Sequence, residues 1–119
     1  MSIQRLQVLP GRLSHALVHN GTVYITGQVP EDITQDLAGQ TKQVLARLEA
    51  LLSEVGSDKS RILFAQIWLK HAVRDFDAMN AVWEAWIPHD ALPARATVEA
   101  NLADDEILIE IALQAAVTA

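Results

Sequence analysis

The chain has 119 residues, half of them hydrophobic, which is enough for one domain with an ordinary core. Its 15 acidic and 9 scattered basic residues give a formal charge of −6, which opposes binding to nucleic acid or to an anionic membrane. It has no cysteine, so disulfides, thiolate metal ligands and thiol nucleophiles are excluded. We expect a single domain over residues 1–119 and, because no apolar run resembles a signal peptide or membrane span, a cytoplasmic protein.

Short apolar runs between turn residues predict two or three strands in the first 30 residues. One run, around residues 6–8, ends at Pro10-Gly11. The runs 16–18 and 22–26 flank Asn20-Gly21, which is a hairpin signal. The segment 27–30 then ends the last of these strands.

Two amphipathic helices and a buried strand are predicted next. Residues 37–55 carry leucine and valine at spacings of three and four, with Thr34 or Asp36 as the N-terminal cap and Gly56 after the end. Residues 62–69 are almost continuously apolar, as in a strand covered on both faces. We expect Asp75 to cap a second helix with an apolar stripe, which consists of Phe76, Met79, Val82, Trp83 and Trp86.

Two further strands, around residues 96–101 and 106–117, complete an α+β pattern in which both helices cover one face of a mixed sheet. The last strand places Ile107, Ile109 and Ile111 on one face, yet its other face is still largely apolar. A face of that kind is too apolar for water. We therefore expect a homo-oligomer with sites between its subunits.

Two charged residues in these last strands indicate a pocket for a small organic acid. Arg95 offers a planar fork of donors that fits a carboxylate, and Glu110, within an aliphatic strand, is a candidate proton carrier. If the two strands pair, both charges could face one cleft. The alternative is an ordinary ion pair of Arg95 with Glu99 or Glu110.

Weaker signals surround this pair. Thr26 and Gly27 end a strand with a hydroxyl and a position free of Cβ, which permits close approach of a ligand, although a simple turn would need the same residues. Asn80 is a poor helix former inside the second predicted helix and could instead bond to a loop. The histidines lack metal-ligand spacing, so no metal site is expected. The tryptophans are typical of core or interface packing.

The chain resembles a known family over nearly its whole length. The resemblance rests above all on Pro93-Ala94-Arg95, on residues 75–80 and on Ile109-Glu110-Ile111, together with the segments 11–14, 23–30 and 40–41. It is similar to the reactive intermediate deaminase family, called RidA or YjgF. The segments 18–21 and 79–83 look more like its divergent YoaB-like branch.

The resemblance implies a chorismate-mutase-like fold assembled as a homotrimer with clefts between subunits. It also implies a hydrolase that needs no cofactor and converts reactive 2-imino acids, such as the imine of 2-aminoacrylate, to 2-keto acids and ammonia. By that analogy Arg95 clamps the substrate carboxylate and Glu110 handles water and protons. Thr26, Gly27, Asn80 and Thr97 would line the cleft.

Leu13 is the main departure from the family pattern. Many members have an aromatic hydroxyl there, at the border of the pocket, and leucine cannot replace its hydrogen bond. Thr26 replaces a serine and Thr97 a cysteine. The loss of this aromatic residue leaves a second interpretation open: a non-catalytic trimer that binds a small carboxylate or a partner protein. The resemblance also implies a third, a ribonuclease or translation inhibitor, which the acidic charge makes less favoured.

Overall fold

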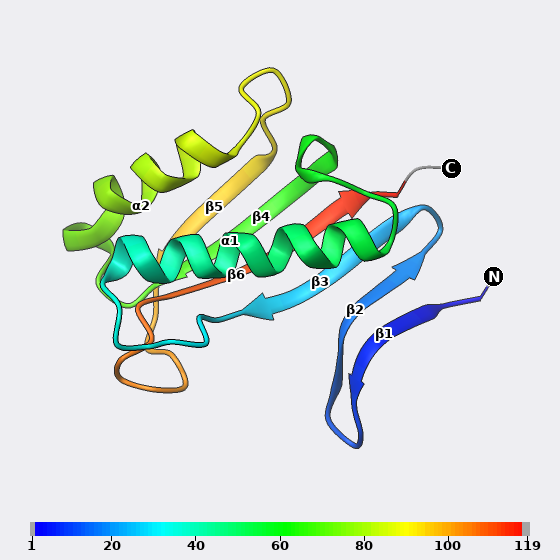
Figure 1. The fold of residues 1–119 in the computed structure, drawn as a ribbon, viewed down its shortest axis with the longest axis horizontal. Helices are drawn as coiled ribbons and strands as arrows, with labels where there is room; N and C mark the ends of the chain where they lie inside the picture. Colours follow the sequence, from blue (N-terminus) through cyan, green and yellow to red (C-terminus); the bar gives the residue numbers. More distant parts are fainter. Residues whose placement is uncertain (1, 118–119) are drawn as a thin grey trace.

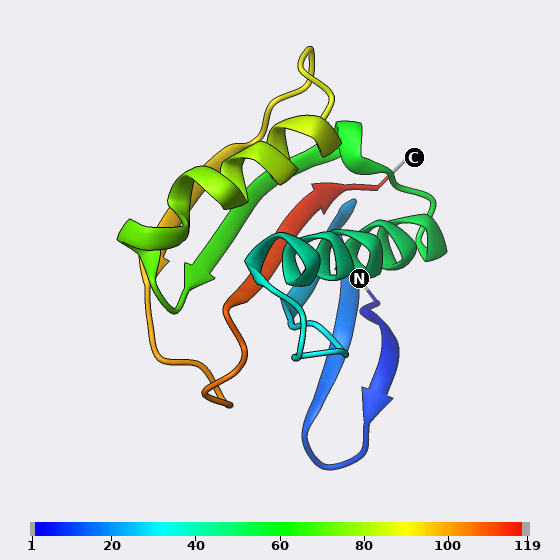
Figure 2. The ribbon, with the colours of Figure 1, turned by 60° about the vertical axis from the view of Figure 1, so that its left-hand side comes forward.

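Six strands form one mixed sheet, and both helices lie on the same side of it in the computed structural model, which describes residues 2–117 (Figures 1 and 2). The order across the sheet is β1-β2-β3-β6-β4-β5, and every neighbouring pair is antiparallel except β4 and β5. The α+β arrangement predicted from the sequence is therefore confirmed. The elements in chain order are β1 (Gln4–Leu9), β2 (Leu13–His19), β3 (Thr22–Gln28), α1 (Leu37–Glu54), the short 3-10 helix η1 (Lys59–Arg61), β4 (Ile62–Leu69), α2 (Ala72–Trp86), β5 (Ala94–Glu99) and β6 (Ile109–Ala116).

The predicted turn between β2 and β3 and the predicted caps of α1 are present. Asn20 and Gly21 both have positive φ, at 51° and 76°, as a two-residue hairpin loop requires. Asp36 caps α1 by accepting a hydrogen bond from the Gly39 amide at 2.8 Å, and Gly56 follows the helix with φ of 74°. Of the two candidate caps, Thr34 instead donates to Asp32.

The second helix begins earlier than predicted, and Asp75 is not its cap. The helix starts at Ala72, whose amide donates to the carboxylate of Glu99 at 2.9 Å. This bond from outside the helix satisfies a free N–H of the first turn, so no capping side chain is needed there. Asp75 lies within the first turn and makes a two-pronged contact with Arg74, with both N–O distances at 3.0 Å.

The penultimate strand does not pair with the last strand. β5 runs parallel to β4 at the edge of the sheet, with β4 between it and β6. Its register places Arg95 beside Ala65 and Thr97 beside Ile67, which both face the helices. The last strand also starts later than predicted, at Ile109, since residues 104–107 form a turn.

The core lies between the helices and one face of the sheet. On β6, Ile109, Ile111 and Leu113 are at most 2% exposed, as their alternation predicts. No element of residues 2–117 covers the opposite face, which we call the open face, although it carries a series of large apolar side chains. These include Leu17, Tyr24, Phe64, Trp68 and Val98.

Candidate functional site

Arg95 lies on the edge strand β5 and points to the helix side of the sheet. Its guanidinium carbon is 5.5 Å from the ring centre of Trp83 and 6.0 Å from that of Phe76, both on α2. These aromatic faces attract the cation and hold its plane. Within residues 2–117 it forms no ion pair, so neither alternative partner, Glu99 or Glu110, neutralises it. Glu99 is bonded to the start of α2 instead.

A cavity of about 550 Å³ opens beside this guanidinium. One wall comes from Asn80, Trp83 and Glu84 of α2 and from Ile87, the residue that follows the helix, which lie on one flank because they are spaced at i, i+3, i+4 and i+7. The structure thus brings Arg95 and Asn80 together. The loop between α2 and β5 completes the lining with His89 and Leu92.

Burial lowers the pKa of Arg95, and the nearby carboxylate of Glu84 opposes that shift. A guanidinium remains charged under all ordinary conditions, so the cavity keeps a permanent positive fork. That fork retains free donors because its neighbours are mostly ring faces. It can therefore bind a carboxylate through two parallel hydrogen bonds.

Thr97 follows Arg95 on the same face of β5. Its hydroxyl oxygen is buried and has no hydrogen-bond partner within residues 2–117. Buried hydroxyls without a partner are uncommon and costly. Thr97 is absent from the lining of the Arg95 cavity.

Glu110 occupies a different part of the molecule. It lies on β6 opposite Trp68 and faces the open side of the sheet. In the part of the chain that the structure describes, its carboxylate forms neither a hydrogen bond nor an ion pair, and burial raises its pKa. A half-buried acid with a raised pKa can exchange protons nearer neutral pH than an ordinary glutamate.

Gly27 makes room for this carboxylate. The β3–β6 register shifts between Ile25 and Gln28, so the strand bulges at Thr26 and Gly27. A Cβ on Gly27 would overlap the Oε2 atom of Glu110 and lie 2.8 Å from its Cδ. A side chain at residue 27 would therefore force the Glu110 carboxylate to move from this position. Thr26 lines a neighbouring hollow of about 330 Å³ on the open face.

The amide of Gln28 is occupied within the fold and takes no part in this surface. Gln28 is 1% exposed, and its side-chain nitrogen donates to the carbonyl of Thr26 at 3.0 Å. The same nitrogen is 3.2 Å from Nδ1 of His15, and its oxygen accepts from Arg47 at 3.2 Å. These bonds fix the conformation of the bulge that carries Thr26 and Gly27.

Arg95 and Glu110 point to opposite faces of the sheet in one chain. Val98 and Glu110 both align with Trp68, on the two sides of β4, and therefore share the open face. Arg95 is three positions before Val98, so alternation directs it to the helix side. The two charges cannot contact one small molecule within a single chain. The condition under which both charges would face one cleft, direct pairing of β5 with β6, is not met in the isolated chain.

Leu13 lies at the start of β2 and is 43% exposed. Three strands separate β2 from β5, so this residue is remote from Arg95 in the same chain. Its neighbour Ser14 lines the hollow that contains Thr26. The predicted site residues thus divide into a group around Arg95 and a group on the open face.

Several residues of the Arg95 cavity were not identified from the sequence as candidates. Trp83 was interpreted as core or interface packing, and Phe76 as part of the apolar stripe of the helix, but both contact the guanidinium. The helical spacing from Asn80 to Glu84 and Ile87 could have indicated the cavity wall. His89 lies in a loop without a motif. No group of three or more acidic or histidine residues within positions 2–117 could hold a metal ion, and neither described helix is long and apolar enough to cross a membrane.

Comparison with known proteins gives consistent matches over almost the whole chain. A family model described as endoribonuclease L-PSP matches residues 4–117. A RutC family protein of Haemophilus influenzae is 46% identical over 115 residues, which cover 95% of this chain and 97% of that protein. The RutC family protein YoaB of Escherichia coli K12 is 42% identical over 117 residues, covering 98% and 100% of the two chains.

Solved structures agree with these matches. A member of the YjgF protein family from Neisseria meningitidis superposes with a TM-score of 0.93 at 40% identity, covering 100% of this chain and 98% of that one. An uncharacterised protein from Pseudomonas aeruginosa gives a TM-score of 0.94 at 37% identity, with 98% and 100% covered. The sequence motifs, the sheet with its two helices and these full-length matches lead to one conclusion: the chain belongs to the RidA/YjgF family and has YoaB among its relatives.

Proposed function

We propose that this protein hydrolyses reactive 2-imino acids to 2-keto acids and ammonia, without a cofactor. The observation that carries the proposal is Arg95: a guanidinium that forms no ion pair in the described chain and is held by two aromatic rings at the wall of a cavity. Such a group fits the carboxylate shared by all 2-imino and 2-keto acids. Asn80, in the same cavity wall, is a second polar group that could orient the ligand.

Glu110 supplies the proton transfers in this proposal. Its protonated form donates to the imine nitrogen, which makes the carbon more electrophilic. The resulting carboxylate then accepts a proton from the attacking water as the C–O bond forms. Collapse of the carbinolamine releases ammonia and leaves the ketone, so the consumed water balances the reaction. A raised pKa favours both roles, because the two forms of the acid coexist nearer neutral pH.

The active unit in this proposal is an oligomer, which we expect to be a trimer. Arg95 and Glu110 face opposite sides of the sheet in one chain, so a ligand can touch both only if a second copy presents its Glu110 to the edge strand β5. The apolar open face supports such contacts, because Tyr24 and Val98 are 42% and 46% exposed there. Thr26 and Gly27 would join the cleft with the Glu110 that they surround.

A non-catalytic trimer that binds small carboxylates is the second candidate. It is favoured by Leu13, an exposed apolar residue where many members of the family have an aromatic hydroxyl. Such a protein would use the same cleft and would bind 2-keto acids without turnover. The family model's description also raises ribonuclease activity, but a chain with a formal charge of −6 is poorly suited to a phosphate backbone.

The decisive experiment generates 2-imino acids with an amino-acid oxidase and follows their decay with and without the protein. We expect acceleration that is proportional to protein concentration and is strongly reduced in Glu110→Gln. Trapping the imine with semicarbazide gives an independent reading of its concentration. Absence of acceleration, together with calorimetric binding of pyruvate, would replace the deaminase proposal with the binding protein.

A further inference from the structure

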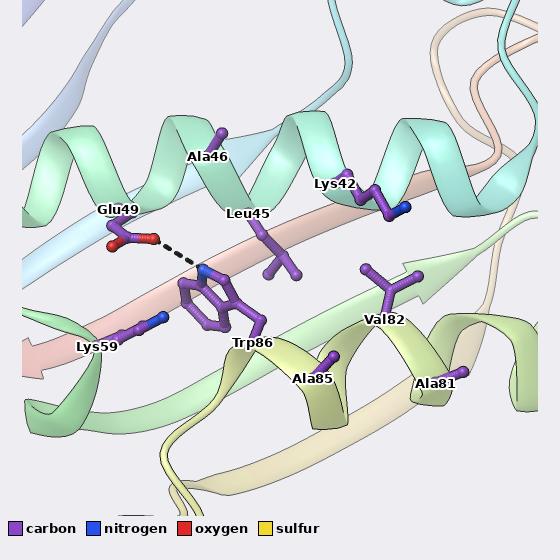
Figure 3. Close-up of a pocket in the computed structure, with 9 residues that line it drawn as sticks. All are labelled: Lys42, Leu45, Ala46, Glu49, Lys59, Ala81, Val82, Ala85 and Trp86. Atoms are coloured by element: carbon purple, nitrogen blue, oxygen red, sulfur yellow. Dashed lines mark hydrogen bonds between the residues drawn. The ribbon is translucent and has the colours of Figure 1, made fainter.

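A second cavity lies between the two helices, away from Arg95. It measures about 540 Å³, within the range typical of small-molecule sites. We call it the interhelical groove. Nine residues of α1, η1 and α2 line it: Lys42, Leu45, Ala46, Glu49, Lys59, Ala81, Val82, Ala85 and Trp86. Figure 3 shows the two helices facing each other across it, with Leu45 and Val82 directed toward one another.

The groove is present because alanines occupy positions of α1 and α2 at which larger side chains would pack between the two helices. Ala81 and Ala85 are one turn apart on α2, and Ala46 lines the groove from α1. Larger side chains at these positions would fill the space by ridge-into-groove packing. Leu45 and Val82 form an apolar floor.

A fixed aromatic wall closes one end of the groove. The indole nitrogen of Trp86 donates to Glu49 at 2.9 Å, which ties the ring to α1. The ammonium of Lys59 lies 5.4 Å from the centre of the same ring. In Figure 3 the indole has Glu49 and Lys59 on one side and Leu45 and Val82 on the other. This arrangement presents a rigid flat surface on which a second ring could stack.

The charges of the groove select an anion. Two ammonium groups, Lys42 and Lys59, line it, and neither forms an ion pair within residues 2–117. The single carboxylate, Glu49, is bonded to Trp86. Lys42 lies past Leu45, away from the indole and across the groove from Val82. A ligand with a flat apolar body and one negative group would therefore match both ends.

We propose that the interhelical groove binds a small aromatic carboxylate, with its ring against Trp86, Leu45 and Val82 and its carboxylate at Lys42. This site is separate from the cavity of the proposed deaminase. The groove is lined by Ala81, Ala85 and their neighbours, whereas the Arg95 cavity uses Asn80 and Glu84 on the other flank of α2. The helix side of the sheet also remains open to ligands if copies associate through the open face.

Calorimetric titration of the full chain with 2-naphthoate, and with neutral 2-naphthamide of the same shape, tests the proposal. We expect one saturable site per chain for the acid and binding weaker by about tenfold for the amide, since a charge-assisted contact is lost. Lys42→Met should lower the affinity for the acid by about the same factor and leave that for the amide unchanged. Equal affinity for the two probes, or an unaffected Lys42→Met variant, would overturn the proposal.

The position of the 2-naphthoate site is tested with a variant whose larger side chain fills the interhelical groove, and with a matched control variant. Ala85→Leu should abolish binding, whereas Ala50→Leu, an exposed alanine on the other flank of α1, should not. If Ala85→Leu is found unfolded by thermal denaturation, Ala81→Leu replaces it. Arg95→Ala should bind 2-naphthoate as the parent chain does. Loss of binding in Arg95→Ala, or persistence in both filling variants, would place the ligand elsewhere and refute this site, whatever the outcome of the imine assay.

Discussion

The Arg95 cavity and the Gly27–Glu110 surface are built on different principles. The first uses one flank of α2 and an edge strand, and aromatic rings hold its cation. The second uses a bulge between two central strands, and an absent Cβ makes space for its acid. Each contains a half-buried ionisable group that forms no ion pair within the described chain. Such charges are costly alone, which is a physical reason to expect that two copies of the chain bring them together.

Removing the guanidinium of Arg95 should cause the largest loss of catalytic activity. Arg95→Ala eliminates a bidentate charged contact, so we expect a loss of about 2–4 kcal/mol of transition-state binding, roughly thirtyfold to a thousandfold in kcat/KM for 2-imino acids. Arg61→Ala, an exposed arginine at the end of η1, is the control and should retain full rate. An Arg95→Ala variant as fast as the parent would end the assignment of this residue.

The second largest loss of activity should come from Gly27→Ala, which adds a methyl group beside the Glu110 carboxylate. In Gly27→Ala the new methyl group would overlap the Glu110 carboxylate and displace it, and displacement by about 1 Å can cost as much as a hundredfold in rate. We expect a fall in kcat with a smaller change in KM, measured by the same imine assay. In the double variant Gly27→Ala and Glu110→Asp, the shorter aspartate leaves room for the methyl group. This double variant should therefore recover part of the lost activity. Full activity of Gly27→Ala alone would contradict the proposed position of the acid.

Mixing two inactive variants tests whether the arginine and the acid of one active site come from different chains. Arg95→Ala and Glu110→Gln, unfolded together and refolded at equal amounts, should form random oligomers. If each site takes its arginine from one chain and its acid from the next, about a quarter of the sites contain both native residues. Activity should therefore return to about a quarter of the parent level, after oligomer formation is verified by light scattering. A mixture no more active than its components would exclude a site shared between subunits.

The sequence predicted the elements better than their pairing. Periodicity and turn residues identified the helix that begins after Asp36 and the hairpin at Asn20-Gly21, since both signals act within a few residues. The parallel pairing of β5 with β4 depends on how residues far apart pack, and no local pattern contains it. Consequently the face on which Arg95 lies could not be assigned. The cap at Asp75 failed for a similar reason, because Glu99 supplies the bond from a distant strand.

The sequence allowed the charged residues of the candidate site to be identified, but not their arrangement in space. Arg95 and Glu110 stood out because charges in apolar strands are rare. Trp83 did not, since the same residue at the same helical spacing is typical of a core. Its contact with the guanidinium appears only once β5 lies beneath α2.

Replacing that aromatic support should have an intermediate effect. Trp83→Leu keeps an apolar side chain but removes the ring face 5.5 Å from the Arg95 guanidinium. We expect KM for 2-imino acids to rise by about threefold to tenfold with little change in kcat, in line with the strength of partly buried cation–π contacts. Trp83→Phe retains a ring and should behave nearly as the parent. Equal defects in the two variants would indicate a role in packing alone.

The smallest effect concerns stability and pH. Burial raises the folded-state pKa of Glu110 above its ordinary value of 4.5, so ionisation is less favourable in the folded than in the unfolded chain. The associated stability is present at low pH and is lost as pH rises through the folded pKa. In the dissociated single chain, Glu110→Gln avoids this loss and should be more stable than the parent at pH 7, by no more than about 0.5 kcal/mol because solvent screens a half-exposed charge. Denaturant unfolding at several pH values should show the difference closing below the ordinary pKa. A parent chain more stable than Glu110→Gln at pH 7 would mean that a countercharge already neutralises the acid, as a neighbouring Arg95 in an assembled oligomer would do.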